Sequence, residues 1–262
     1  WNRQKIYELM GFDEFISFDN IKKYMDEDDI EYVRHYVSDR TSFKLVTDRL
    51  ENKKSGEKMF LFNVTMQNHG GYTYDGGEFP TVTISNLQGH YKEAEQYLSL
   101  IKESDKAFEE LVRYLKNYDE PTIVVMFGDH QPAVEQEFYE ELYGKSLSKL
   151  STEELQQRYK IPFVIWANYD IESQDDLKTS PNYLSDLLLD TANVPKNEIE
   201  NFTSEVRNDV PQINAMGHYD SDGNWVSRDE DTSNALDKYE AVEYYMLTRK
   251  ESKDAKENKD DK

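Results

Sequence analysis

The fold of this chain is decided by Val124-Val125-Met126-Phe127-Gly128-Asp129-His130-Gln131-Pro132. The apolar run that ends at Phe127 predicts a buried β-strand, which Gly128 ends. Asp129 and His130 then follow side by side, at the place where open α/β folds put their chemistry. Carboxylate and imidazole are both ligands of divalent metals, so the pair predicts a metal site. The alternative is a helix-capping aspartate beside an incidental histidine, and the place after a core strand favours the metal site.

Two further segments predict strands of the same kind. Residues 59–65 and 161–167 are rich in aromatic and apolar side chains, and like residues 123–127 they do not alternate with polar ones. Strands that are apolar on both faces are typical of a parallel sheet. Helical spacing of apolar residues predicts helices between and after the strands, over residues 38–52 and 91–115, from Ser180-Pro181 through Leu188, and over 235–247. Residues 217–225 predict a turn or hairpin. The order predicts an α/β fold with a mostly parallel central sheet sandwiched by helices.

The composition excludes several classes of function. The chain has 262 residues and a formal net charge of -22, which argues against binding to nucleic acid and to anionic lipid. It contains no cysteine, which excludes disulfides, thiolate metal sites and cysteine nucleophiles. No run of about 18 apolar residues is present, so the sequence predicts no membrane span.

His69 is the second candidate site residue, because it follows the predicted strand at residues 59–65. The ends of adjacent parallel strands lie within about 10 Å of each other. We therefore expect His69, Asp129 and His130 to face one pocket. A loop histidine that only hydrogen-bonds backbone is the alternative.

The amino terminus supplies the third candidate, Trp1-Asn2-Arg3. The planar guanidinium of Arg3 suits a phosphate or sulfate, and Trp1 suits an apolar wall beside it. Terminal residues are more often frayed, which is the competing interpretation. The remaining histidines are expected to be structural: His35 on a charged helix over residues 28–36, His90 and His218.

Together these elements resemble the lipoteichoic acid synthase-like branch of the sulfatase/alkaline phosphatase superfamily. The matching pieces, in order, are Trp1-Asn2-Arg3, Tyr7, Gly11-Phe12-Asp13, Thr65-Met66-Gln67-Asn68-His69, Phe127-Gly128-Asp129-His130 and Ser180-Pro181-Asn182-Tyr183-Leu184. The resemblance runs from residue 1 to about residue 195. It implies an alkaline phosphatase/sulfatase-like fold.

The resemblance also implies a role for each candidate. Asp129 and His130 are then metal ligands, and Mn²⁺ is the metal that we expect, with Mg²⁺ and Zn²⁺ as alternatives. His69 contacts the substrate phosphate and is a candidate general acid. Trp1 and Arg3 line the pocket for a phosphoglycerol head group.

The chain departs from the family pattern at its start. The nucleophilic threonine, an acidic metal ligand and the membrane-spanning segments of that family all precede the Trp-Asn-Arg element. We therefore expect a partial catalytic domain over residues 1–249, with a core at 1–195 and a C-terminal subregion at 196–249. We expect the charged residues 250–262 to be disordered. The fragment alone is predicted to be inactive, because Thr81 and Thr83 lie in the wrong place to replace the nucleophile.

The implied function is metal-dependent phosphoglycerol transfer in the synthesis of a lipoteichoic acid-type polymer. The expected partners are a phosphatidylglycerol-like lipid head group and a glycerol-phosphate polymer acceptor. The resemblance places the domain on the extracellular face of the cell membrane of a Gram-positive bacterium. A sulfatase or phosphodiesterase on the same fold is the first alternative. A non-catalytic module that binds cell-wall glycan through some of the 19 tyrosines is the second.

Overall fold

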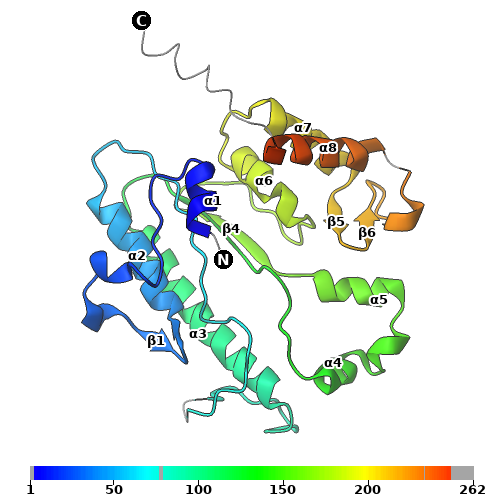
Figure 1. Cartoon of the computed structure of the whole chain (residues 1–262), viewed down its shortest axis with the longest axis horizontal. Helices are drawn as coiled ribbons and strands as arrows, with labels where there is room; N and C mark the ends of the chain where they lie inside the picture. Colours follow the sequence, from blue (N-terminus) through cyan, green and yellow to red (C-terminus); the bar gives the residue numbers. More distant parts are fainter. Residues whose placement is uncertain (1–2, 77–78, 233, 249–262) are drawn as a thin grey trace, which may run out of the picture. The chain divides into compact units, whose positions relative to one another are not determined.

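The computed structural model describes residues 3–76, 79–232 and 234–248 (Figure 1). The chain divides into two compact units, each described here by itself. Unit 1 comprises Trp1–Thr122 and His130–Ser151, and unit 2 comprises Ile123–Asp129 and Thr152–Lys262. The boundaries that we expected at residues 195 and 249 stay a prediction, and the charged segment 250–262 lies outside the described residues.

Unit 1 is built on two long helices that pack against each other, α2 and α3. Helix α2 begins after Ser38, whose side chain accepts a hydrogen bond from the backbone of Thr41 and so caps the first turn. Phe43 and Phe108 meet between the helices with ring centroids 6.4 Å apart. Both helices were predicted from their spacing. The elements of unit 1 are α1 (Arg3–Leu9), η1 (Ile21–Lys23), η2 (Glu27–Asp29), β1 (Tyr32–Val33), β2 (Tyr36–Val37), α2 (Asp39–Asn52), α3 (Lys92–Leu115), α4 (Gln136–Tyr143) and η3 (Leu147–Lys149).

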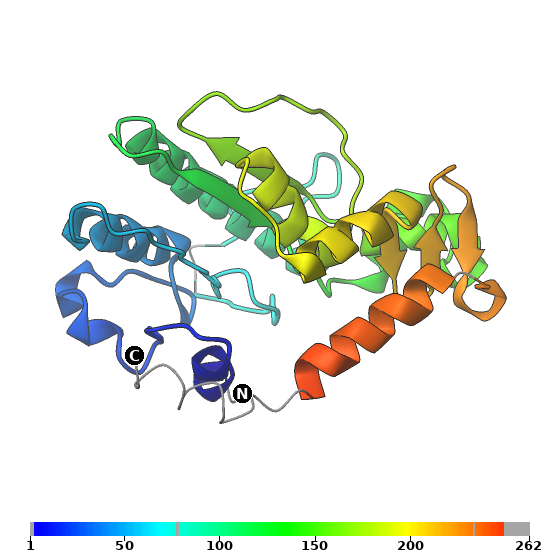
Figure 2. The ribbon, with the colours of Figure 1, turned by 90° about the horizontal axis from the view of Figure 1, so that it is seen from above.

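Unit 2 contains a two-stranded and a three-stranded sheet with helices beside them. Helix α8, orange-red in Figure 2, contacts α7, and the core of this unit gathers around Tyr183, Val206 and Tyr239. The hairpin at residues 217–225 and the helix at 235–247 were predicted and are confirmed. The elements are β3 (Ile123–Phe127), α5 (Thr152–Gln156), η4 (Gln157–Tyr159), β4 (Phe163–Ala167), η5 (Pro181–Tyr183), α6 (Leu184–Thr191), α7 (Glu198–Asp209), β5 (Gln212–Asn214), β6 (Gly217–Tyr219), β7 (Trp225–Ser227), η6 (Arg228–Glu230) and α8 (Asn234–Thr248).

The expected parallel pairing is wrong for the strands that the structure describes. Strand β3 pairs with β4 in the antiparallel direction, with Ile123 opposite Ala167. The remaining sheets, β1-β2 and β5-β6-β7, are antiparallel as well. The mixed α/β class holds. The expected burial on both faces is wrong, because no residue of β3 or β4 is fully buried and Phe127 and Val164 are 40% and 48% exposed. An apolar run also does not record the direction of the neighbouring strand.

Residues 59–65 do not form the predicted strand. The segment is not helical, and its backbone makes no backbone hydrogen bond among the described residues. Phe60 is 68% exposed and Phe62 is 48% exposed. A strand requires the ladder of hydrogen bonds to a neighbour, and suitable side chains do not supply one.

The predicted helix over residues 28–36 is also wrong. Only Glu27–Asp29 is helical there, as a short 3-10 turn. The residues after it form the β1–β2 hairpin, in which Tyr32 lies opposite Val37 and Val33 opposite Tyr36. Arg34 and His35 are the turn of this hairpin, and Arg34 has a positive φ of 56°. His35 is exposed, as expected, but at a hairpin tip.

Candidate functional site

His69 lies in a loop that is tied to the start of α2 and to the middle of α3. Gln67 is 2% exposed, and its Oε1 accepts a hydrogen bond of 3.0 Å from the backbone N–H of Asp39, at the start of α2. Its Nε2 donates to Ser104 Oγ of α3 at 3.2 Å, and Asn68 Nδ2 donates to the same oxygen at 2.7 Å. The loop therefore begins in the interior of unit 1.

The carboxylate of Asp39 completes this buried group. Ser104 Oγ donates to Asp39 Oδ2 at 2.5 Å, so the hydroxyl accepts from two amides and donates to one carboxylate. Burial raises the pKa of Asp39, although the hydrogen bond from Ser104 acts in the opposite direction. Few conformations satisfy so many buried polar groups together, and this holds the start of the loop in place.

The imidazole of His69 leaves this buried anchor and is exposed. Its Nδ1 lies 3.3 Å from the hydroxyl of Tyr36 on β2. Arg34, in the hairpin turn, donates a hydrogen bond of 2.8 Å to the backbone carbonyl of His69. The side chain is thus exposed to a ligand while the backbone that carries it is held, which is the arrangement expected of a binding or catalytic group.

Asp129 and His130 directly follow β3, as predicted. The backbone N–H of Gly128 donates to Pro162 O at 3.2 Å, which continues the β3–β4 ladder as far as the residue before Asp129. Asp129 and His130 are exposed. His130 Nδ1 donates to Gln131 O at 2.8 Å. With the proton on Nδ1, Nε2 is the ring nitrogen with the lone pair that suits a metal ligand.

The described residues do not complete a metal centre around this pair. No group of three or more His, Asp or Glu side chains in the part of the chain that the structure describes is arranged to hold a metal ion. The donor types of Asp129 and His130 fit a divalent metal, but two ligands are fewer than such sites use. The common pocket that we expected for His69, Asp129 and His130 stays a prediction.

The amino-terminal candidates are placed only in part. Arg3 begins helix α1 and is exposed. Trp1 lies outside the described residues, so its expected place in a head-group pocket stays a prediction.

Sequence reasoning missed Arg34 and Tyr36, because both were assigned to a helix. The signal was present in Tyr32-Val33-Arg34-His35-Tyr36-Val37, where two aromatic and β-branched pairs flank a two-residue turn. That composition is typical of a hairpin.

The fold is a mixed α/β fold in which an Asp-His pair closely follows a strand. Residues 1–194 match the Sulfatase family, and the chain belongs to that family. None of the helices in the described ranges is long and apolar enough to cross a membrane.

Two proteins of Rhizobium meliloti (strain 1021) are similar in sequence. The "Putative cyclic beta-1,2-glucan modification protein" is 26% identical over 262 residues, which are 97% of this chain and 35% of that protein. The "Capsular polysaccharide biosynthesis protein RkpI" is 29% identical over 130 residues, which are 50% of this chain and 21% of that protein. The chain therefore spans only about a third of the length of the first relative.

One solved structure shares the fold. The Streptococcus pyogenes phosphoglycerol transferase GacH, in complex with sn-glycerol-1-phosphate, matches with a TM-score of 0.61 and 21% identity. The match covers 91% of this chain and 55% of that chain. It confirms the sulfatase-like fold that the resemblance implied.

Proposed function

We propose that this chain is part of a metal-dependent phosphoglycerol transferase that modifies or builds a polymer of the bacterial cell envelope. The observation that carries the proposal is Gly128-Asp129-His130 directly after β3 in a chain of the Sulfatase family. The structural neighbour's name supports the transferred group, and the names of the two relatives support a glycan as the material modified. The donor is a phosphatidylglycerol-like head group, and the acceptor is an envelope glycan or a glycerol-phosphate polymer of the lipoteichoic acid type.

Asp129 and His130 would hold the metal, with His130 binding through Nε2. Mn²⁺ is the proposed ion, because oxygen and imidazole donors suit it, although they also suit Mg²⁺ and Zn²⁺. Held there, a divalent ion would supply a lowered pKa for an attacking hydroxyl and would offset charge on phosphoryl oxygens.

His69 is proposed to donate a proton or a hydrogen bond to the phosphate. When the hydroxyl of Tyr36 donates to Nδ1, the ring carries its own proton on Nε2, which is then the donor. A donor on the exposed side of the ring suits the leaving oxygen of a phosphodiester. Arg3 is proposed to bind the phosphate with its planar guanidinium, and Trp1 to line the same pocket.

A lipid donor implies that this domain works at a membrane surface. We propose the extracellular face of the cell membrane of a Gram-positive bacterium, because envelope polymers are assembled there. The net charge of -22 does not favour direct adsorption to anionic lipid, so the contact would be made by the head group in the site.

The test measures phosphoglycerol release from phosphatidylglycerol by the protein in its full natural length, with Mn²⁺ added. Asp129→Ala and His130→Ala are expected to abolish both release and Mn²⁺ binding measured by calorimetry, and Asp119→Ala serves as an exposed-aspartate control. Release that persists in Asp129→Ala contradicts the proposal. Glycan binding without metal, unchanged in both variants, supports the binding-module alternative instead.

The match to the Sulfatase family supports a second candidate function, which is hydrolysis of a sulfate ester by a protein of the same fold. The same protein is assayed on an aryl sulfate beside phosphatidylglycerol. Turnover of the sulfate ester alone contradicts the transferase and supports a sulfatase.

A further inference from the structure

We propose that Arg34 and Tyr36, on the β1–β2 hairpin, are positioning residues for His69. Arg34 fixes the backbone of the loop, and Tyr36 fixes which ring nitrogen carries the proton. The importance of this positioning for catalysis rests on the function proposed above for His69. The positioning itself can be tested without an activity assay.

Arg34 holds the loop through three backbone carbonyls. Its Nη2 donates to Gln67 O at 2.7 Å and to His69 O at 2.8 Å, and its Nη1 donates to Gly71 O at 3.1 Å. The three acceptors are alternate residues centred on His69. A planar guanidinium with donors in a fixed fork can bind all three together, which the single ammonium of a lysine cannot do in the same geometry.

The guanidinium is also enclosed by two aromatic rings. Its Cζ lies 5.4 Å from the ring centroid of Tyr36 and 5.6 Å from that of Tyr72, and Tyr72 Oη donates to Asn68 O at 2.9 Å. Burial lowers the pKa of Arg34, and its Nε is buried with no hydrogen-bond partner among the described residues. The positive φ of Arg34 suits the first position of a two-residue hairpin turn. The three hydrogen bonds to the loop offset the partial desolvation of the guanidinium.

Tyr36 acts on the ring itself. Its hydroxyl lies 3.3 Å from His69 Nδ1, and the two ring centroids are 5.7 Å apart. A phenol hydroxyl can donate to a ring nitrogen, and we assign this direction, with Nδ1 as the acceptor. The neutral ring must then carry its proton on Nε2. In this way one hydrogen bond selects the tautomer that can donate to a phosphate.

The hairpin and the loop make a further contact beyond these two residues. His35, at the tip, packs edge-to-face against Tyr74 with ring centroids 5.2 Å apart. The hairpin therefore contacts the loop on both sides of His69. The start of the loop has its own anchor in Gln67 and Ser104, so the contacts of Arg34 and Tyr36 act chiefly on the exposed part, which includes the imidazole.

The first experiment measures the tautomer of the His69 imidazole. We expect long-range ¹H–¹⁵N correlation spectra to show His69 mainly as the Nε2–H tautomer, and Tyr36→Phe to shift it to a mixture while other signals stay unchanged. Tyr32→Phe, at the other end of the same hairpin, is the matched control and should leave the ring unchanged. Nitrogen shifts of His69 that are the same in Tyr36→Phe and in the native protein overturn the role of Tyr36.

The second experiment measures how readily the backbone of the His69 loop opens. Arg34→Lys keeps the charge and loses the fork, and we expect amide hydrogen exchange across residues 69–72 to accelerate about tenfold, a typical consequence of easier local opening. Arg40→Lys, an exposed arginine on α2, is the control and should leave exchange in the loop unchanged. Unchanged exchange in Arg34→Lys overturns the clamp.

Phosphoglycerol transfer by the full-length protein distinguishes the positioning of His69 from the proposed function. In the full-length protein we expect Tyr36→Phe to lower kcat about tenfold with little change in KM. This loss is smaller than the loss expected when a general acid itself is removed, because His69 is still present. A tautomer shift without loss of transfer contradicts the positioning role in catalysis. A native protein that shows the ring and loop behaviour but transfers no phosphoglycerol contradicts the proposed function and leaves the placement of His69 supported.

Discussion

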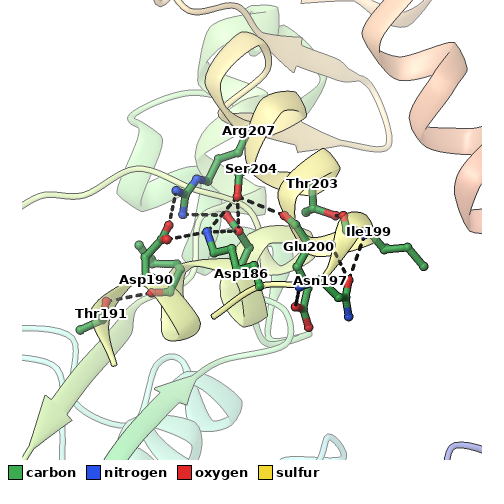
Figure 3. Close-up of polar contacts among 11 residues, drawn as sticks. Asp186, Asp190, Thr191, Asn197, Ile199, Glu200, Thr203, Ser204 and Arg207 are labelled. Carbon is green, nitrogen blue, oxygen red and sulfur yellow. Dashed lines mark hydrogen bonds and ion pairs between the residues drawn. The ribbon is translucent and has the colours of Figure 1, made fainter. Parts of the chain in front are cut away.

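Two polar networks, one in each unit, differ in where they end. In unit 1 the contacts of Arg34, Gln67 and Ser104 lead outward to His69, whose ring is exposed. In unit 2 the network around Asp186 closes on itself (Figure 3). One network therefore presents an exposed imidazole, and the other only joins helices.

The Asp186 network joins α6 to α7. Asp186 is 1% exposed, with Lys196 Nζ 2.5 Å from its Oδ1 and Arg207 Nη1 3.0 Å from its Oδ2. Ser204 Oγ donates to the same carboxylate at 2.5 Å. Asp190, on the outer side, pairs with both cations at 2.5 and 2.8 Å. Two carboxylates and two cations thus neutralise one another, and the desolvation of Asp186 is offset within the group.

The two networks should respond differently when a side chain in them is replaced. A closed group of buried charges should affect stability and leave no ligand site behind. In the open group, a change at the buried start should also cost stability, whereas a change at the exposed part should displace the imidazole with little effect on the free energy of unfolding. Substitutions in and outside the two networks test this contrast.

Asp186→Ala should have the largest effect, a loss of about 3 kcal/mol in the free energy of unfolding, because Lys196 and Arg207 lose their buried partner. Urea unfolding measures it. Glu205→Ala, an exposed acid on α7, is the control and should change stability by less than about 0.5 kcal/mol. A loss below about 1 kcal/mol for Asp186→Ala would show that the network is not held as the structure describes.

Gln67→Leu should cost about 2 kcal/mol, because the backbone N–H of Asp39 and the hydroxyl of Ser104 lose a buried partner. The same unfolding experiment measures the loss. Gln88→Leu, at an exposed glutamine, is the matched control. Equal stabilities of the two variants would contradict the buried anchor of the His69 loop.

Asp190 should make unfolding depend on pH. Burial acts to raise its pKa, but the hydrogen bonds from Lys196 and Arg207 outweigh burial and lower the pKa in the folded state. Its contribution to stability is therefore present above the unfolded pKa of about 3.9 and is lost as the pH falls through the lower folded value. The stability difference between the native protein and Asp190→Asn should be below about 1 kcal/mol at pH 7 and shrink below pH 4. A difference that grows on acidification would reverse the sign of this prediction.

Phe62→Ser should have the smallest effect, within about 1 kcal/mol, because the side chain is already 48% exposed. Leu100→Ala, at a fully buried position of α3, should cost about 2–5 kcal/mol under the same conditions. A large loss in Phe62→Ser would mean that residues 59–65 are packed in solution as the strand that their composition predicted.

The helices were predictable because their signals are local. Ser38 caps α2, and apolar residues recur at helical spacing along α3, so a window of a few turns holds the whole signal. The place of Asp129 and His130 after β3 was predictable for the same reason. Residues 59–65 show the limit: their side chains suit a strand, yet the described residues supply no backbone partner.

Sequence alone was sufficient for α2, α3, α6 and α8, for the hairpin at 217–225 and for Gly128-Asp129-His130 directly after a strand, because each depends on neighbours within a few residues. Only the tertiary structure decided that β3 pairs antiparallel with β4 and that Arg34 holds the loop of His69. Arg34 and its three acceptors are 33, 35 and 37 residues apart in the chain. Such contacts form only when packing brings distant segments together, and no periodicity in the sequence records them.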